Sequence, residues 1–135
     1  MNSSIVPLEV RQMIEAHLLA MTQTLLRGDH LGVARFYADN ALLTDLKSSR
    51  VEGREAIDQH WIQLPTYKEW TLRVLETGGD AETPHQRLLS VARLEIEGQE
   101  YVDEGYCFVV WRQQPDGAYR IHVDIYCPIR FEAQP

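Results

Sequence analysis

The chain has 135 residues, of which 44% are hydrophobic and 24% are charged, and its formal net charge at pH 7 is −7. This length predicts a single domain over residues 1–135. The negative charge argues against nucleic acid as a partner, because phosphate binding requires a basic face. No apolar run reaches the roughly 18 residues that span a bilayer, and the basic residues are scattered, so we expect no membrane contact either.

The two cysteines, Cys107 and Cys127, are too few for a disulfide framework. Residues 1–4 do not have the pattern that begins a signal peptide. We therefore expect reduced thiols in a cytoplasmic protein. The sequence has no glycine-rich phosphate loop, no His-Glu-x-x-His and no Gly-x-Ser-x-Gly motif, and we predict neither a cofactor nor a metal.

The first half of the chain has a helical pattern. Pro7 can open a helix because its missing N–H is not needed in the first turn, and Gly28 can end it. The apolar stripe of this helix consists of Val10, Ile14, Leu18, Met21 and Leu25. Asp29 is a favourable N-cap for a short second helix over residues 30–38.

A brief strand over residues 41–45 follows the short helix, and residues 46–52 are predicted to form a polar connection. A third helix begins at Gly53 and stops at Pro65, which cannot continue it. The apolar side of this helix consists of Ile57, Trp61 and Leu64.

From Tyr67 onward, apolar residues alternate with polar ones, which is the period of a strand. Turn signals at residues 78–80, 97–99 and 114–117 divide this half of the chain. The predicted strands begin at Tyr67 and then cover residues 87–97, 100–112 and 119–128, and residues 131–135 form a tail. Helices followed by a meander of long strands predict an α+β fold.

Several short motifs occur in a recognisable order. They are Gly28-Asp29, Tyr37-Ala38-Asp39-Asn40-Ala41, Asp45, Gly53-Arg54-Glu55-Ala56-Ile57 and Gly117-Ala118-Tyr119-Arg120-Ile121. Their order and spacing resemble the nuclear transport factor 2-like superfamily, and its SnoaL-like and ketosteroid-isomerase-like branch in particular. The resemblance implies a cone-shaped, curved mixed β-sheet whose concave face is covered by three N-terminal helices, with a core over about residues 8–128. It also implies a pocket for a small molecule, but no particular reaction, since this fold hosts many activities.

In ketosteroid isomerases the position that matches Asp45 is a general base, and the resemblance implies that role here. The catalytic tyrosine of those enzymes falls on Met21, and their second catalytic acid falls near Cys107, so both groups are missing. We therefore do not expect steroid isomerisation. Tyr37 and Trp61 fall on positions that line the family's pocket.

The last predicted strand has one apolar face and one polar face. Its apolar residues are Tyr119, Ile121, Val123 and Ile125, and they alternate with Arg120, His122, Asp124 and Tyr126. Alternation alone would bury the apolar face beneath the helices. The resemblance implies the reverse, with the polar face turned toward the helices and the apolar face against a second subunit. We favour the second interpretation because residues 106–111 are apolar on both faces, which indicates cover on both sides. It predicts a homodimer through the convex face of the sheet.

Three residues are candidates for acid–base chemistry. His122 and Asp124 share a face of one strand, where a carboxylate raises the pKa of an imidazole and orients it. The alternative is an exposed polar pair. Asp45 in a pocket would suit proton abstraction beside a carbonyl, or it is a turn residue that bonds to the backbone after Thr44.

Five further residues are expected to line the pocket. Tyr37 and Tyr126 could donate a hydrogen bond to a substrate oxygen, although such a tyrosine more often packs with a satisfied hydroxyl. Met21, Trp61 and Cys107 are expected to line the pocket without taking part in chemistry.

Two functions remain open. The first is a cofactor-free isomerase, dehydratase or cyclase that uses Asp45, His122 and Asp124 for general acid–base chemistry on a small apolar carbonyl compound. The second is a non-catalytic domain that binds a small molecule or dimerises. A metal site would need those three residues to converge with His60 or His85, which no spacing indicates.

Overall fold

The computed structural model describes residues 5–45 and 50–135. Its helices are α1 (Leu8–Leu26), α2 (His30–Ala34) and α3 (Arg54–Ile62). Its strands are β1 (Tyr37–Asp45), β2 (Arg50–Glu52), β3 (Thr66–Gly78), β4 (His85–Ile96), β5 (Gln99–Gln113) and β6 (Tyr119–Ala133).

The apolar stripe of α1 is the side of that helix that faces the core. Its buried residues include Val10, Ile14, Leu18, Met21 and Leu25. Gly28 follows the helix with a φ of 85°, a conformation that glycine adopts without strain. Asp29 then caps α2, because its side chain accepts a hydrogen bond from the backbone N–H of Gly32 at 2.9 Å. Among the described residues, no helix is both long and apolar enough to cross a membrane.

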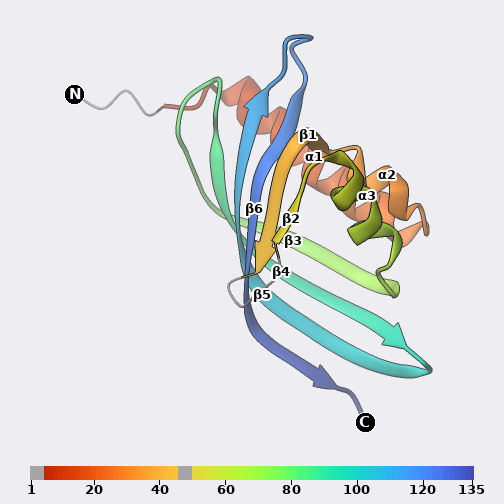
Figure 1. Cartoon of the computed structure of the whole chain (residues 1–135). Coiled ribbons are helices and arrows are strands. Elements are labelled where there is room, and N and C mark those ends of the chain that lie inside the picture. Colours follow the sequence, from red (N-terminus) through yellow and green to blue (C-terminus); the bar gives the residue numbers. More distant parts are fainter. Residues whose placement is uncertain (1–4, 46–49) are drawn as a thin grey trace.

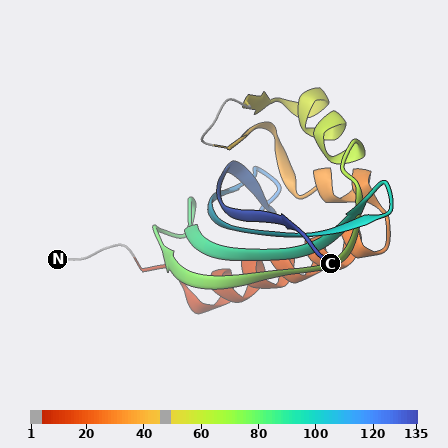
Figure 2. The same ribbon diagram turned by 90° about the horizontal axis from the view of Figure 1, so that it is seen from below.

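The sheet is mixed and has the strand order β2-β1-β6-β5-β4-β3. β1 and β6 are parallel, whereas the other neighbouring pairs are antiparallel. The long strands bend strongly along their length, and the helices gather on the concave side (Figure 1). Seen from below, the strands form a curved band, with α1 and α3 well apart (Figure 2). This arrangement confirms the predicted α+β fold.

The core lies between the helices and the concave face of the sheet. Side chains of α1 pack there with a cluster from β4, β5 and β6 that consists of Leu88, Val109, Trp111 and Ile121. Trp111 is fully buried, and its indole N–H donates to the side-chain oxygen of Gln86 at 2.9 Å. This part of the concave face is thus filled by packed side chains.

Three predicted boundaries are wrong. Residues 37 and 38 begin a strand rather than end the short helix, because Tyr37 pairs with Ile121 of β6, and this pairing overrides local helix preference. Residues 39 and 40 belong to the same strand, which was predicted to begin only at residue 41. Within the predicted connection over residues 46–52, Arg50–Glu52 forms strand β2 against β1, and residues 46–49 lie outside the described part. The predicted tail is strand as far as Ala133, and the Phe131 ring stacks on that of Tyr101 at 4.8 Å.

β6 presents residues of different polarity to the helices in its two halves. The ladder with β5 passes from the pair Trp111–Ile121 to the pair Val110–Val123, so His122 is an extra residue at a bulge. A bulge resets the alternation of side chains along a strand.

This change in alternation at His122 decides which interpretation of the last strand applies to each half. In the first half of β6 the apolar Ile121 is buried in the core, as alternation predicts. In the second half Asp124 and Tyr126 turn to the concave side, as the resemblance implies. Each interpretation is therefore right for one half of the strand.

Candidate active site

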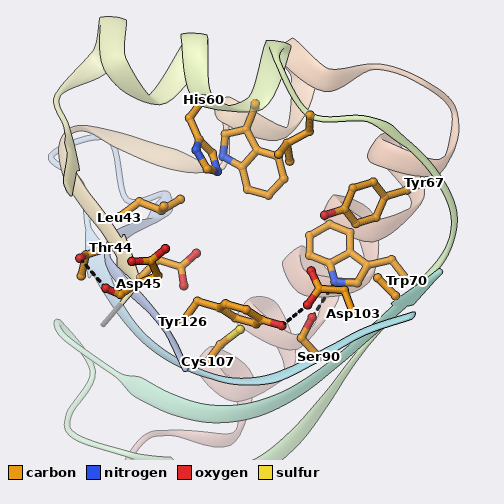
Figure 3. A pocket seen from close by; sticks show the side chains of 14 residues that line it. Leu43, Thr44, Asp45, His60, Tyr67, Trp70, Ser90, Asp103, Cys107 and Tyr126 are labelled. Atoms are coloured by element: carbon orange, nitrogen blue, oxygen red, sulfur yellow. Dashed lines mark hydrogen bonds between the residues drawn. The ribbon is translucent and has the colours of Figure 1, made fainter. Parts of the chain in front are cut away.

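A cavity of about 220 Å³ opens between α3 and the concave face of the sheet. The lining residues are Leu43, Thr44, Asp45, His60, Trp61, Leu64, Tyr67, Trp70, Ser90, Ala92, Asp103, Cys107, Asp124 and Tyr126. In Figure 3, His60 points into this cavity from α3, while Tyr126 and Cys107 lie on the opposite side, which we call the floor. The cavity thus brings together residues from both halves of the chain.

Asp124 is an acid in the wall of the cavity with a strongly raised pKa. The Tyr37 hydroxyl donates to its Oδ2 at 2.6 Å, and Asp124 pairs with Leu43 across the β1–β6 ladder. Burial raises the pKa of Asp124 to about 6, and the hydrogen bond from Tyr37 opposes this rise because it favours the ionised form. Asp124 can therefore change its protonation state close to neutral pH.

Tyr37 is the partner that holds Asp124 in place. Its side chain is 2% exposed, and burial together with the nearby Asp124 charge raises its pKa well above the ordinary value. The nearby indole N–H of Trp61 opposes this rise in the pKa of Tyr37, because it favours the ionised form. Within the described part of the chain this N–H is buried and has no hydrogen-bond partner. The phenol therefore keeps its proton and remains a hydrogen-bond donor to Asp124.

A second phenol–carboxylate pair lies on the floor of the same cavity. The Tyr126 hydroxyl donates to Oδ1 of Asp103 at 2.6 Å, as Figure 3 shows. Burial raises the pKa of Asp103, and the hydrogen bond from Tyr126 lowers it in part. The same burial and the Asp103 charge raise the pKa of Tyr126.

Gly105 makes room for this second pair. A Cβ atom at position 105 would lie 2.5 Å from Cε1 of the Tyr126 ring, well inside the distance that real contacts allow. Because β5 has no side chain there, the Tyr126 ring can lie across the strand and reach Asp103. Gly105 and Tyr126 together set the depth of the cavity.

Cys107 and His60 are both uncharged near neutral pH. Burial raises the pKa of Cys107 well above its usual value, and the charges of Asp124 and Asp103 add to this rise. Cys107 is thus a neutral thiol and a poor nucleophile. Burial lowers the pKa of His60, so its ring is a neutral imidazole that can donate one hydrogen bond.

Aromatic rings form much of the remaining wall. The ring centroids of Trp61 and Trp70 are 6.0 Å apart, and the Tyr67 ring meets that of Trp70 edge-on at 5.9 Å. The indole N–H of Trp70 donates to Oγ of Ser90 at 3.0 Å, which fixes the orientation of the ring. A ligand in the cavity would contact these ring faces directly.

Five of the eight predicted site residues line the cavity: Asp45, Trp61, Cys107, Asp124 and Tyr126. Tyr37 does not appear in the lining, but its hydroxyl contacts Asp124. Met21 does not line the cavity either, because its side chain is 4% exposed within the core packed against α1. The structure therefore assembles most of the predicted set, but not all of it.

His122 is the residue that the structure separates from the predicted set. It sits at the bulge of β6, outside the cavity lining, and therefore does not act with Asp124 on one wall. Burial and the nearby Arg112 lower its pKa, which is the opposite of the expected effect of a carboxylate neighbour. The prediction that His122 and Asp124 share a face fails because strict alternation does not hold across the extra residue.

Several lining residues were not predicted from the sequence. Asp103 could have been found, because it has the same alternation phase as Cys107 on β5 and is the acidic residue of that face. Tyr67 and Trp70 are three residues apart on β3, and they share a side only because Lys68 is an extra residue at a bulge, which the residue order does not mark. His60 adjoins Trp61 on α3, and only the packing of α3 shows that both reach the cavity.

No three histidine, cysteine or acidic side chains lie close enough to hold a metal ion, among the residues 5–45 and 50–135 that were searched. The acids of the cavity are thus spread over its wall rather than grouped. The arrangement suits proton transfer between separate groups and a bound organic molecule.

No family model matches the chain, and no curated protein matches its sequence. Solved structures do match its fold. An NTF2-like protein with a cystatin-like fold from Novosphingobium aromaticivorans has a TM-score of 0.73 at 15% identity, covering 90% of this chain and 83% of that one. A ketosteroid isomerase-like protein from Erwinia carotovora atroseptica has a TM-score of 0.75 at 14% identity, covering 88% of this chain and 95% of that one.

A third structure, a putative scytalone dehydratase from Novosphingobium aromaticivorans, has a TM-score of 0.72 at 13% identity. It covers 93% of this chain, and this chain covers 87% of it. Identities this low establish the fold and leave the reaction open. The chain therefore has the nuclear transport factor 2-like fold, with its cystatin-like curved sheet, as the order of its motifs predicted.

Proposed function

We propose that the protein is a cofactor-free acid–base enzyme that moves a proton on a small, largely apolar carbonyl compound. Asp124 is the proton acceptor in this proposal. The observation that supports it is the carboxylate of Asp124, held at 2.6 Å by Tyr37 inside an aromatic cavity, with a pKa of about 6. A base with a pKa close to the working pH is mostly ionised and still strong enough to abstract a proton.

The remaining residues have supporting roles in this proposal. Asp124 takes a proton from the carbon beside the carbonyl group, and the carbonyl oxygen gains negative charge as an enolate forms. The neutral imidazole of His60, which points into the cavity, can donate a hydrogen bond to that oxygen. Asp45 lines the same cavity two register pairs beyond Leu43–Asp124, and in its protonated form it can give a proton to a second position of the substrate.

The reaction class follows from what happens after the enolate forms. Return of the proton at another carbon is an isomerisation, and loss of a neighbouring hydroxyl as water is a dehydration. Two of the similar structures are named as ketosteroid isomerase-like and as a putative scytalone dehydratase, and these names refer to an isomerisation and a dehydration, which supports the choice.

The test follows proton abstraction directly, without assuming a product. In deuterated buffer, the protein should catalyse exchange of the α-hydrogens of 2-tetralone or 2-indanone, followed by NMR. The rate should rise with pH through about 6, and Asp124→Asn should lower it by about 10²–10⁴-fold. His122→Ala is the control and should leave the rate unchanged, because His122 lies outside the cavity lining.

A non-catalytic binding domain is the second candidate function. Both buried carboxylates already accept a phenol hydrogen bond, and the tyrosine and second acid of ketosteroid isomerases are replaced by Met21 and Cys107. Saturable binding of these ketones without any exchange above the buffer rate would support this function and exclude the enzyme. Exchange that survives Asp124→Asn would exclude Asp124 as the base.

A further inference from the structure

The charge of the cavity is unusual for a site that is largely apolar. Asp103 and Asp124 both line it, and no lysine or arginine does so among the described residues. Neither aspartate takes part in an ion pair within residues 5–45 and 50–135, and the only hydrogen bond to each comes from a neutral phenol there. Asp45 adds a third acidic residue to the lining.

Two partly buried carboxylates without a positive partner are unfavourable in a largely apolar cavity. Burial is the largest influence on both acids and raises both pKa values, and no cationic side chain lowers either of them. An opposite charge placed between them would recover part of the lost solvation energy. An anionic ligand would meet repulsion from both.

The aromatic wall adds a second, independent preference for positive charge. Four aromatic residues of the lining come from α3, β3 and β6: Trp61, Tyr67, Trp70 and Tyr126. Figure 3 shows Tyr67 and Trp70 on a different side of the cavity from Tyr126. Ring faces attract a cation that lies within about 6 Å, and the attraction is strongest for tryptophan and in sites that exclude water. An ammonium group would therefore find ring faces and carboxylates in the same cavity.

We propose that the cavity binds an organic cation, a small apolar molecule that bears an amine or a quaternary ammonium group. The cation lies among the rings of Trp61, Trp70 and Tyr126, between the carboxylates of Asp103 and Asp124. A metal ion does not fit this site, because the described acidic and histidine side chains do not converge closely enough. This inference names the ligand class of the cavity in the proposed function, and so rests on the same cavity but not on any turnover.

The experiment compares three molecules of similar size that differ in charge. Benzylammonium, benzyl alcohol and benzoate are titrated separately into the full-length protein by calorimetry at about pH 7.5. We expect benzylammonium to bind at least about tenfold more tightly than benzyl alcohol, with no measurable binding of benzoate. Equal affinity for the cation and the alcohol, or tighter binding of benzoate, would overturn the inference.

Variants separate the two contributions. Asp103→Asn and Trp70→Leu should each reduce the preference for benzylammonium over benzyl alcohol, by about threefold to tenfold. Glu9→Gln removes one negative charge from the exposed start of α1 and should leave the preference unchanged. A loss of preference in Glu9→Gln equal to that in Asp103→Asn would assign the effect to net charge and contradict the site.

The pH dependence supplies a further test, and it separates this inference from the proposed function. Benzyltrimethylammonium keeps its charge at every pH, so its affinity should fall as the pH drops below about 6 and Asp124 takes up a proton. Cation preference without ketone exchange would leave this inference standing and remove the enzyme. Ketone exchange that depends on Asp124, without any preference for the cation, would leave the enzyme standing and remove this inference.

Discussion

The ionised carboxylate of Asp124 lies where burial makes a charge unfavourable. Its charge therefore has a measurable effect on the stability of the folded protein. The unfolded chain has the ordinary pKa of 3.8, whereas the folded pKa is about 6. Between these two values the folded state binds more protons than the unfolded state, so stability falls as pH rises through this interval and is level above it. At neutral pH the penalty is on the order of 3 kcal/mol.

Asp124→Asn should therefore stabilise the protein while removing its proposed base. We expect the free energy of unfolding in urea to rise by roughly 1–3 kcal/mol at about pH 7.5, since an amide carries no charge and can still accept from Tyr37. At about pH 4 the gain should nearly vanish, because Asp124 is then protonated in the folded state. Glu9→Gln is the control, and a gain that is the same at both pH values would contradict this account.

At the scale of elements, Arg54 links α3 to the segments beside it through several contacts. Arg54 donates to the backbone oxygen of Tyr37 at 3.0 Å and to that of Ala34 at 2.5 Å. It also forms an ion pair with Asp58 at 2.9 Å. These contacts join α3 to the junction between α2 and β1, and α3 carries His60 and Trp61 to the cavity.

Arg54→Met should loosen α3, because two backbone oxygens then lose their donor. We expect a loss of roughly 2–3 kcal/mol in the free energy of unfolding, with faster hydrogen exchange at the amides of α3 than at those of α1. Arg54→Lys should recover only part of the loss, since a single ammonium group cannot match the fork of a guanidinium. Arg50→Met, which breaks only an exposed pair with Glu52, should change little; an equal loss there would contradict the role of Arg54.

The sequence predicted elements better than it predicted their pairing. The stripe of α1 and the capping of α2 by Asp29 depend on neighbours in the chain, so local patterns were sufficient to find them. The parallel pairing of β1 with β6 joins residues far apart in sequence, and it places residues 37 and 38, which were predicted to be helical, in a strand.

The candidate site shows the same division between local and distant information. Asp45, Asp124 and Tyr126 were found through the resemblance and by alternation on strands. His122 was misplaced because nothing in the residue order marks the bulge beside it. The neighbours of Asp124 that shift its pKa belong to other elements, so that shift needed the three-dimensional packing.

At the scale of the whole molecule, the convex face of the sheet carries exposed apolar side chains. They include Tyr106 and Phe108 on β5, which alternate with the cavity-lining Cys107, and Cys127 on β6, which pairs with Tyr106. Scattered apolar residues are common on protein surfaces, but these come from two neighbouring strands, β5 and β6. The predicted homodimer through this face remains our proposal.

Phe108→Glu should convert a dimer to a monomer in sedimentation velocity, because it places a charge in the middle of the proposed contact. Leu19→Glu changes an equally apolar residue that is 60% exposed on α1, and it should leave the dimer intact. A wild-type protein that sediments as a monomer at high concentration would exclude the dimer. Dissociation of the dimer in both variants would contradict a contact confined to the convex face of the sheet.

The absence of a side chain at position 105 has a consequence for how such a cavity can change. The Tyr126 ring occupies the space that the methyl group of an alanine at position 105 would need. Gly105→Ala would therefore push the ring into the cavity. The backbone of β5 and β6 could stay as it is while the space above shrank. A single substitution at this position could therefore change the size of ligand that the cavity accepts, without any change in topology.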